Sequence, residues 1–234
     1  VSVLVAAGPV AADAEAETGF VAKRIEVGGI EHGYYVYVPA EYDAAKAWPL
    51  VLFLHGMGQR GDDGVAQTTE GMGPAIKKHP ERFPCLVVMP QCPPTAWWHR
   101  MVDLLDAVLA ETRAAYNVDD NRLYLTGTSM GGFGSWMYAA RNPGLFAAVL
   151  PLCGAGKPEE AQAVGRSSVP VWAFQGDADK VVTPGATERM VEVARAAGGE
   201  VRYTLYPGVG HNCWDRAYGD PEVIAWMLEQ RKTR

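Results

Sequence analysis

One serine of the chain stands in a pattern that is typical of an enzymatic nucleophile. Ser129 is the centre of a Gly-Thr-Ser-Met-Gly motif at residues 127–131. In Gly-x-Ser-x-Gly motifs the serine occupies a sharp turn between a strand and a helix, and its hydroxyl points out beyond the sheet edge. The turn crowds the backbone, so the flanking positions have to lack side chains. An apolar run at 123–126 and a helix-like segment at 130–142 surround the motif, which favours a nucleophile over a simple glycine-rich loop.

A serine hydroxyl needs a base at neutral pH, and His211 is the candidate. A neighbouring base has to take the hydroxyl proton before the oxygen can attack. Where a serine sits on such a turn, the acid and then the histidine follow it in the chain. Of the five histidines only His211 follows Ser129, directly after the last β-like run. We therefore predict that His211 is the base, whereas His55, which precedes the serine, is interpreted as a loop brace.

Two aspartates are candidates for the carboxylate that orients the base. Asp177 and Asp179 both follow the apolar run at 169–174. A spacing of two places both side chains on one side of an extended segment, so spacing does not choose between them. The aspartate that is not the triad acid could cap a turn or pair with Lys180.

Acyl transfer also requires N–H donors for the negative charge that develops on the carbonyl oxygen. The backbone N–H of Met130 is expected to be one donor because it follows the nucleophile. The other is expected from the His-Gly-Met-Gly segment at 55–58, which follows a buried apolar run. Met57 is the natural supplier there, and Gly58 is the alternative.

Tryptophans cluster on the segments that are expected to surround this chemistry. Trp97, Trp98 and Trp214 are predicted on loops at the carboxyl edge of the sheet, where ligands bind in open α/β sheets. Trp97 or Trp98 could form a wall of the acyl or alcohol pocket, or could simply pack in the core. Three tryptophans inside regular elements are expected in the core: Trp136, Trp172 and Trp226.

Apolar runs alternate with helix-like segments along the rest of the chain. A hairpin is expected first, because β-like runs at 20–27 and 30–38 are separated by two glycines. Alternation of strands and helices then predicts an α/β fold: a mostly parallel sheet with an N-terminal antiparallel hairpin and helices on both faces. The expected later strands are 49–54, 85–89, 123–126, 146–152, 169–174 and 200–206, and the expected helices are 74–79, 99–116, 130–142, 184–197 and one from 221.

The composition excludes several classes of partner. The 234 residues are 48% hydrophobic and 21% charged, which is ordinary for a globular protein. The net charge is −6 and no basic run precedes the last four residues, so nucleic-acid binding is disfavoured. No transmembrane helix is expected. The histidines lack ligand spacing and the four cysteines lack Cys-x-x-Cys spacing, so we expect no metal and no cofactor. Disulfide pairing and oligomeric state stay open.

The N-terminal segment has the composition of a leader. Residues 1–12 are apolar and rich in small side chains, and they pass into Ala-Asp-Ala-Glu-Ala at 12–16. This pattern resembles the end of a secretory signal with an Ala-x-Ala-like cleavage site. We therefore expect residues 1–19 to be a signal remnant or a disordered leader, and 20–234 to be a single catalytic domain. Secretion or periplasmic export is the expectation, with a cytoplasmic location left open.

Together the motifs resemble the α/β-hydrolase superfamily. Within it they are similar to the phospholipase/carboxylesterase-type esterases, often labelled predicted peptidases, which neighbour the dienelactone hydrolases and feruloyl esterases. This resemblance implies an α/β-hydrolase fold and Asp179 as the triad acid. Gln175 departs from the relatives, which often carry His there, and we expect it to alter loop packing more than chemistry. The matching segments are 54–61, 90–93, 120–132, 175–179 and 206–214.

The function predicted from these residues is that of a serine carboxylesterase that hydrolyses short-chain or aryl esters. Residues 154–168 are too few for a full cap domain, so we expect an open cleft and a small-molecule ester substrate. Two other functions are alternatives to this one. A peptidase of prolyl-oligopeptidase type would resemble relatives that carry an N-terminal propeller, for which no segment here is long enough. A non-catalytic binding homologue would need a broken triad, and every triad position is filled.

Overall fold

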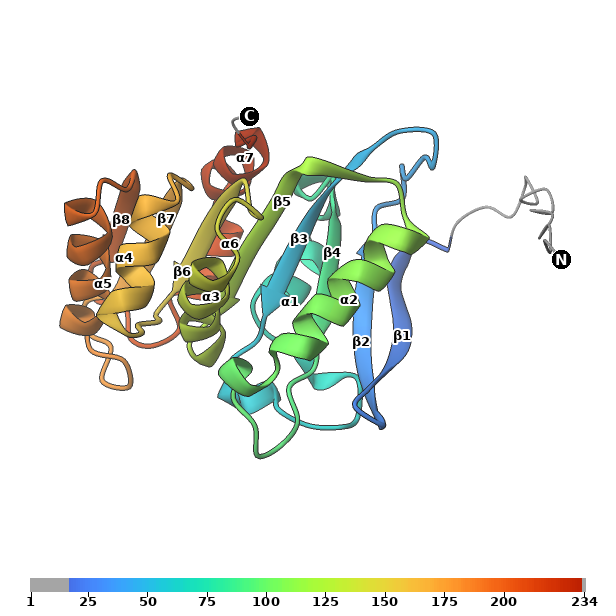
Figure 1. Cartoon of the computed structure of the whole chain (residues 1–234), viewed down its shortest axis with the longest axis horizontal. Helices are drawn as coiled ribbons and strands as arrows, with labels where there is room; N and C mark the ends of the chain where they lie inside the picture. Colours follow the sequence, from blue (N-terminus) through green and yellow to red (C-terminus); the bar gives the residue numbers. More distant parts are fainter. Residues whose placement is uncertain (1–16, 233–234) are drawn as a thin grey trace, which may run out of the picture.

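A computed structural model describes residues 17–232 of the chain. It contains an eight-stranded sheet in the order β1-β2-β4-β3-β5-β6-β7-β8 (Figure 1). Most of the expected leader lies outside the described residues, and Gly19 already belongs to the first strand. The strands are β1 (Gly19–Val27), β2 (Ile30–Val38), β3 (Trp48–Leu54), β4 (Leu86–Pro90), β5 (Val118–Thr128), β6 (Ala148–Leu152), β7 (Val171–Gly176) and β8 (Val201–Tyr206).

Strand pairing confirms the mostly parallel sheet with an antiparallel hairpin at its N-terminal end. β1 pairs antiparallel with β2, and β2 pairs antiparallel with β4. From β4 through β3, β5, β6 and β7 to β8, each neighbouring pair is parallel. The hairpin turn holds Gly28 at φ 62° and Gly29 at φ 79°, a left-handed conformation that favours glycine at both positions.

Helices cover both faces of the sheet, as Figure 1 shows. In that view α2, α3, α4 and α5 lie in front of the sheet, and α1, α6 and α7 lie behind it. Side chains of β3 alternate between the two layers: Leu50 and Leu52 pack on the α2–α5 side, and Val51 and Phe53 pack on the other side. The helices are α1 (Met72–Lys78), α2 (Val102–Ala115), α3 (Met130–Arg141), α4 (Pro158–Arg166), α5 (Pro184–Ala196), α6 (Trp214–Gly219) and α7 (Pro221–Glu229).

Three helical segments differ from the expectation. The helix expected at 99–116 begins only at Val102, because residues 98–100 form a separate 3₁₀ turn, η4 (Trp98–Arg100). α4 was not expected, although Pro158 at its start and the acidic residues after it are helix-start signals. α6 was not expected either, because a helix of six residues is too short to show a periodic pattern.

The carboxyl ends of the parallel strands bring the predicted site segments to one edge of the sheet. Leu54 of β3 lies beside Gly127 of β5, and Thr128 lies beside Leu152 of β6. Gly176 of β7 lies beside Tyr206 of β8. The loops that follow these strands therefore meet at the lower edge in Figure 1, which is where ligands bind in open α/β sheets.

All four cysteines are free and buried. Burial raises the pKa of Cys85 to about 12, and it raises that of Cys92 to about 12 as well. Over residues 17–232 no helix combines the length and the hydropathy needed to span a bilayer.

Candidate active site

The turn that carries Ser129 is strained and closely packed. Ser129 has φ 53° and ψ −116° at the start of α3, a left-handed conformation that costs a non-glycine residue about 1–3 kcal/mol. A Cβ on Gly131 would lie 1.8 Å from the carbonyl oxygen of Leu54, and a Cβ on Gly127 would lie 2.7 Å from the same oxygen. The turn is therefore pressed against the end of β3, which is why both flanking positions are glycine.

The structure brings Ser129, His211 and Asp179 into one hydrogen-bonded chain. Nε2 of His211 lies 2.8 Å from Oγ of Ser129, and Nδ1 lies 2.7 Å from Oδ2 of Asp179. A carboxylate can only accept hydrogen bonds, so Nδ1 carries the proton. In the neutral imidazole Nε2 then presents its lone pair to the serine hydroxyl, which is the arrangement a general base requires.

The two aspartates that sequence spacing did not separate have different partners. Asp179 accepts the bond from His211. Asp177 is exposed, and its Oδ1 accepts the N–H of Gly208 at 2.7 Å. Asp177 therefore braces the loop that carries His211, while Asp179 contacts His211 itself.

The Asp179 carboxylate is buried and fully hydrogen-bonded. Its Oδ1 accepts the backbone N–H groups of Val181 (2.8 Å) and Val182 (3.1 Å). Its Oδ2 accepts from His211 and, at 2.8 Å, from Nε2 of Gln175. Burial alone would raise the pKa of Asp179, but the hydrogen bonds from His211, Val181 and Val182 outweigh burial and hold it below its usual value. The carboxylate of Asp179 is therefore ionised near neutral pH.

The loops that carry Asp179 and His211 are joined by backbone contacts. Ala178 donates its N–H to the carbonyl oxygen of Val209 at 2.9 Å. A Cβ on Gly176 would lie 2.3 Å from the carbonyl oxygens of Gly210 and Val209, so this position also has to be glycine. This close packing of the two backbone segments fixes the distance between Asp179 and His211, so that distance does not depend on side chains alone.

Each of the two expected oxyanion donors is the first residue of a helical segment beside Ser129. Met57 is the first residue of η1 (Met57–Gln59), and Met130 is the first residue of α3. The first N–H groups of a helix have no intrahelical acceptor, so they are available to a ligand. A Cβ on Gly56 would lie 3.6 Å from Cβ of Ser129, which places the Met57 loop against the nucleophile. Gly58 is exposed, and a Cβ there would meet nothing within 4 Å.

His55 braces this loop, as expected. Its Nδ1 donates to the carbonyl oxygen of Gly56 at 2.6 Å, and its Nε2 accepts the N–H of Cys92 at 2.9 Å. Burial lowers the pKa of His55 to about 4, so the ring is neutral at neutral pH. Both ring nitrogens are occupied by the backbone and neither is free for substrate.

The three tryptophans assigned to the site have three different environments. Trp97 is 37% exposed and packs edge-on against Phe133. Trp98 is buried, and its Nε1 donates to the carbonyl oxygen of His55 at 3.0 Å. Trp214 was expected on a loop, but it is the first residue of α6 and is buried with its ring 5.5 Å from that of His211. That expectation was wrong, because the chain turns into a helix three residues after the base.

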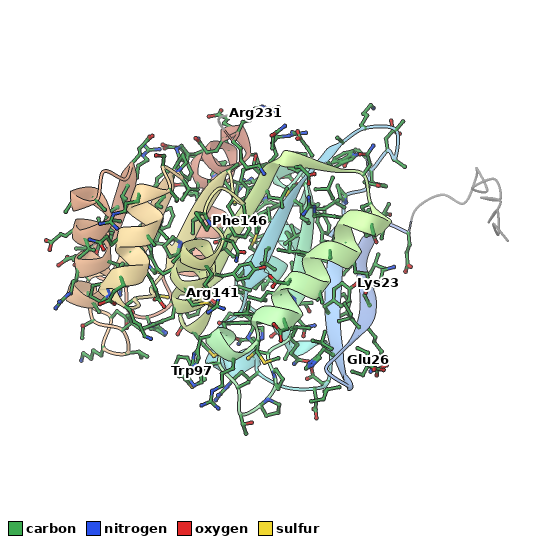
Figure 2. The ribbon with its side chains drawn as sticks, viewed as in Figure 1. Lys23, Glu26, Trp97, Arg141, Phe146 and Arg231 are labelled. Atoms are coloured by element: carbon green, nitrogen blue, oxygen red, sulfur yellow. The ribbon has the colours of Figure 1, made fainter. Side chains whose placement is uncertain are left out.

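A cavity of about 630 Å³ opens between α3, η4 and the start of α4. Trp97, Met130, Phe133 and Met137 form apolar walls, and Trp98 closes the inner side. Figure 2 labels Trp97 at the lower edge and Arg141 further up, at the end of α3, and both line the cavity. The cavity therefore begins at the residue after Ser129 and extends along α3.

Two residues near the site were missed from the sequence. Glu70 lies close to the nucleophile, because a Cβ on Gly56 would lie 3.4 Å from its Oε1. Burial raises the pKa of Glu70, opposed by a hydrogen bond with Gln59 and by the charge of His211. No local signal marks Glu70 within its long loop. Gln175 is expected to alter mainly loop packing, but it contacts Asp179 directly. Over residues 17–232 no group of three or more His, Cys, Asp or Glu side chains could hold a metal ion.

Known proteins similar to this chain are esterases and hydrolases. A putative carboxymethylenebutenolidase from Methylorubrum extorquens is 35% identical over 114 residues, which cover 46% of this chain and 39% of that protein. A thermostable esterase of known structure is 32% identical with a TM-score of 0.81, covering 91% of this chain and 63% of that one. A ferulic acid esterase from Anaeromyces mucronatus is 18% identical with a TM-score of 0.68, covering 91% and 92%.

These similarities confirm the α/β-hydrolase fold that the motifs predicted. The described residues include no large cap domain, because the segment after β6 contributes only the nine-residue α4. This chain spans less than half the length of the curated relatives that it matches. Residues 22–219 match the dienelactone hydrolase family. The chain belongs to the dienelactone hydrolase family.

Proposed function

We propose that this protein is a serine carboxylesterase that hydrolyses short-chain or aryl esters through an acyl-enzyme. The hydrogen-bonded chain from Ser129 through His211 to Asp179 carries this proposal. Membership of the dienelactone hydrolase family and similarity to esterases of known structure support it.

The first half of the proposed reaction acylates Ser129. Its Oγ attacks the ester carbonyl carbon while Nε2 of His211 takes the hydroxyl proton. The N–H groups of Met57 and Met130 stabilise the oxyanion, and the loss of one such donor typically costs about 100- to 1000-fold in kcat. The protonated His211 then gives its proton to the leaving alcohol, and Asp179 stabilises the imidazolium throughout.

The second half of the reaction regenerates the enzyme. His211 takes a proton from a water molecule, which attacks the acyl carbon, and the carboxylic acid leaves as Ser129 recovers its proton. The side chain of His211 is 21% exposed whereas that of Asp179 is fully buried. Water can therefore reach the base without reaching the carboxylate.

The cavity beside Met130 supports an ester with an apolar or aryl part. Its walls Trp97 and Phe133 meet edge-on with ring centroids 6.5 Å apart, and such aromatic surfaces favour flat apolar groups. The name putative carboxymethylenebutenolidase, which matched relatives carry, denotes an enzyme whose substrate is a lactone. A lactone therefore belongs beside open esters in any substrate panel.

Hydrolysis of p-nitrophenyl acetate, butyrate and palmitate tests this function. We expect turnover of the shorter esters with an initial burst of p-nitrophenol, and no burst from Ser129→Ala. A fluorophosphonate label should attach to Ser129. Ser167→Ala is a matched control, because its hydroxyl hydrogen-bonds only within the end of α4. Equal turnover in Ser129→Ala, or labelling elsewhere, would contradict the proposal.

Two other outcomes would support the alternative functions. Cleavage of peptide p-nitroanilides in preference to esters would indicate a peptidase. Absence of both labelling and turnover in the folded protein would indicate a homologue that binds without catalysis. An aryl series with feruloyl and acetyl-sugar esters and a butenolide would then define the substrate class.

A further inference from the structure

Gln175 is a buried polar side chain at the end of β7, next to the acid loop. It is fully buried, and a buried amide costs free energy unless its donors and acceptor are matched. Its Nε2 donates to Oδ2 of Asp179 at 2.8 Å and to the carbonyl oxygen of Val182 at 2.9 Å. Its Oε1 accepts the hydroxyl of Thr187 at 2.7 Å. Every strong hydrogen-bonding group of this side chain therefore has a partner.

The orientation of the Gln175 amide follows from the chemistry of its partners. The carboxylate of Asp179 and the carbonyl of Val182 can only accept, so the NH₂ group has to face them. Thr187 is the residue of α5 that can donate to the remaining oxygen. Its hydroxyl also lies 3.2 Å from the carbonyl oxygen of Gly154, but the bond to Gln175 is shorter. α5 thus fixes the amide, and the amide faces the acid.

Asp179 has two side-chain donors, and both act on the same oxygen. His211 and Gln175 share Oδ2, while backbone N–H groups occupy Oδ1. A donor on Oδ2 withdraws part of the negative charge that would otherwise attract the proton of the imidazolium. It also prevents rotation of the carboxylate away from the base.

We propose that Gln175, oriented by Thr187, is a positioning residue of the Ser129–His211–Asp179 triad. It holds the carboxylate against Nδ1 of His211 and limits how strongly that carboxylate favours the protonated base. This inference rests on the proposed esterase function. Among the other titratable groups near the pair, Cys153 interacts electrostatically with Asp179 and Cys213, and Glu70 interacts electrostatically with His211 and Asp215. Neither donates to Oδ2.

The pH dependence of kcat/KM tests this role in Gln175→Leu and Gln175→Glu. Leucine removes the donor at similar volume, and we expect kcat to fall about tenfold or more with little change in KM. The acid limb should move to higher pH by about 0.5–1 unit, because the carboxylate attracts the imidazolium proton more strongly. Glutamate can share a proton with Asp179 and then donate to Oδ2 as the amide does, so its acid limb should lie closer to the wild-type limb than that of the leucine variant.

Gln91→Leu is the matched control for this experiment. Gln91 is also buried, and it also donates to a carboxylate (Asp63, 2.8 Å) and to a backbone carbonyl (Gln59, 3.2 Å). It touches none of the three triad residues. Its loss should lower the free energy of unfolding much as the loss of Gln175 does, while the acid limb stays where it is in the wild-type protein.

Thr187→Val and Thr187→Ser keep the test decisive if Gln175→Leu does not fold. Valine removes the hydroxyl that orients the amide, so the acid limb should shift in the same direction as in Gln175→Leu but by less. Serine keeps the hydroxyl and should leave the acid limb at its wild-type position. An unshifted acid limb in Gln175→Leu, or in both Thr187 variants, would overturn the inference. If that result is found and Ser129→Ala is inactive, the esterase function stands without a positioning role for Gln175. Activity that persists in Ser129→Ala would instead overturn both.

Discussion

Two loops at the same sheet edge each hold a histidine, and the two rings have different hydrogen-bond partners. His55, after β3, is fully buried and has both ring nitrogens on backbone groups. His211, after β8, is partly exposed and has its nitrogens on Ser129 and Asp179. Burial lowers the pKa of His55 to about 4, so its ring is not protonated near neutral pH.

The difference shows that partners decide the role of a histidine, because residue type and location are shared. Backbone groups are fixed and neutral, so a ring that serves them is a structural crosslink. A hydroxyl and a carboxylate are groups that can exchange or stabilise a proton, so a ring between them is suited to acid–base catalysis. His55 also holds the loop that leads into the η1 turn at Met57.

Replacing the two histidines should give the largest contrast. His211→Ala is expected to lower kcat by about 10⁴- to 10⁶-fold, because the serine loses its base. His55→Gln, which keeps one donor and one acceptor, should retain most of the activity. Initial rates on p-nitrophenyl butyrate with thermal melts on both variants measure this. Comparable losses of kcat in two folded variants would remove the distinction.

The two aspartates of the acid loop sharpen the same comparison on the carboxylate side. Asp179→Asn should lower kcat by about 10⁴-fold, because an amide no longer holds the imidazole in the required tautomer. Asp177→Asn should cost less than about tenfold, because its oxygen accepts only the N–H of Gly208 and an amide oxygen can do the same. If Asp177→Asn proved the more damaging change, the assignment of the acid would be wrong.

The neutral state of His55 predicts a pH dependence of stability. Its folded pKa, about 4, lies below the ordinary value of 6.5. The contribution of neutral His55 to the free energy of unfolding is therefore fully present above about pH 6.5. It is lost as the pH falls towards 4, by about 3 kcal/mol at most. Urea unfolding between pH 7 and 4 measures the loss, and His55→Gln should show a shallower dependence. Parallel curves for the two proteins would argue against a buried neutral His55.

The smallest expected effect concerns the support of the His55 loop. Trp98→Phe removes the hydrogen bond from Nε1 to the carbonyl oxygen of His55, at a cost of about 1–3 kcal/mol for an unpaired buried acceptor. We expect a lower melting temperature and a fall in kcat of about two- to tenfold with KM nearly unchanged. Trp97→Phe is the control, because Trp97 is exposed. It should leave the melting temperature within about 1 °C, since exposed substitutions rarely exceed 0.5 kcal/mol.

Much of the fold and the serine–histidine pair could be predicted from the sequence because their signals are local. The Gly-x-Ser-x-Gly motif, the apolar strands and a single downstream histidine each need only neighbouring residues or chain order. The choice between Asp177 and Asp179 needed more. Treating the segment as extended made the two equivalent, but the chain turns at residues 177–178, so the two carboxylates contact different loops.

The residues that were missed depend on contacts between distant segments. Glu70 lies near Gly56 although it stands two residues before α1, at the end of a long segment whose path no periodic pattern describes. Gln175 contacts its acid across a turn and is oriented by Thr187, which lies 12 residues further on. The resemblance to known esterases drew attention to Gln175, but its contact with Asp179 depends on the direction of the amide, which the sequence does not give.

The four buried thiols offer a way to observe the molecule opening. Their burial keeps them unreactive in the folded state, so a maleimide or a disulfide reagent can modify them only when the chain around them opens. Cys213 lies two residues after His211, whereas Cys85 precedes β4 on the other side of the sheet centre. Comparing the labelling rates of these two cysteines would time the local unfolding of the base loop separately from that of the central strands.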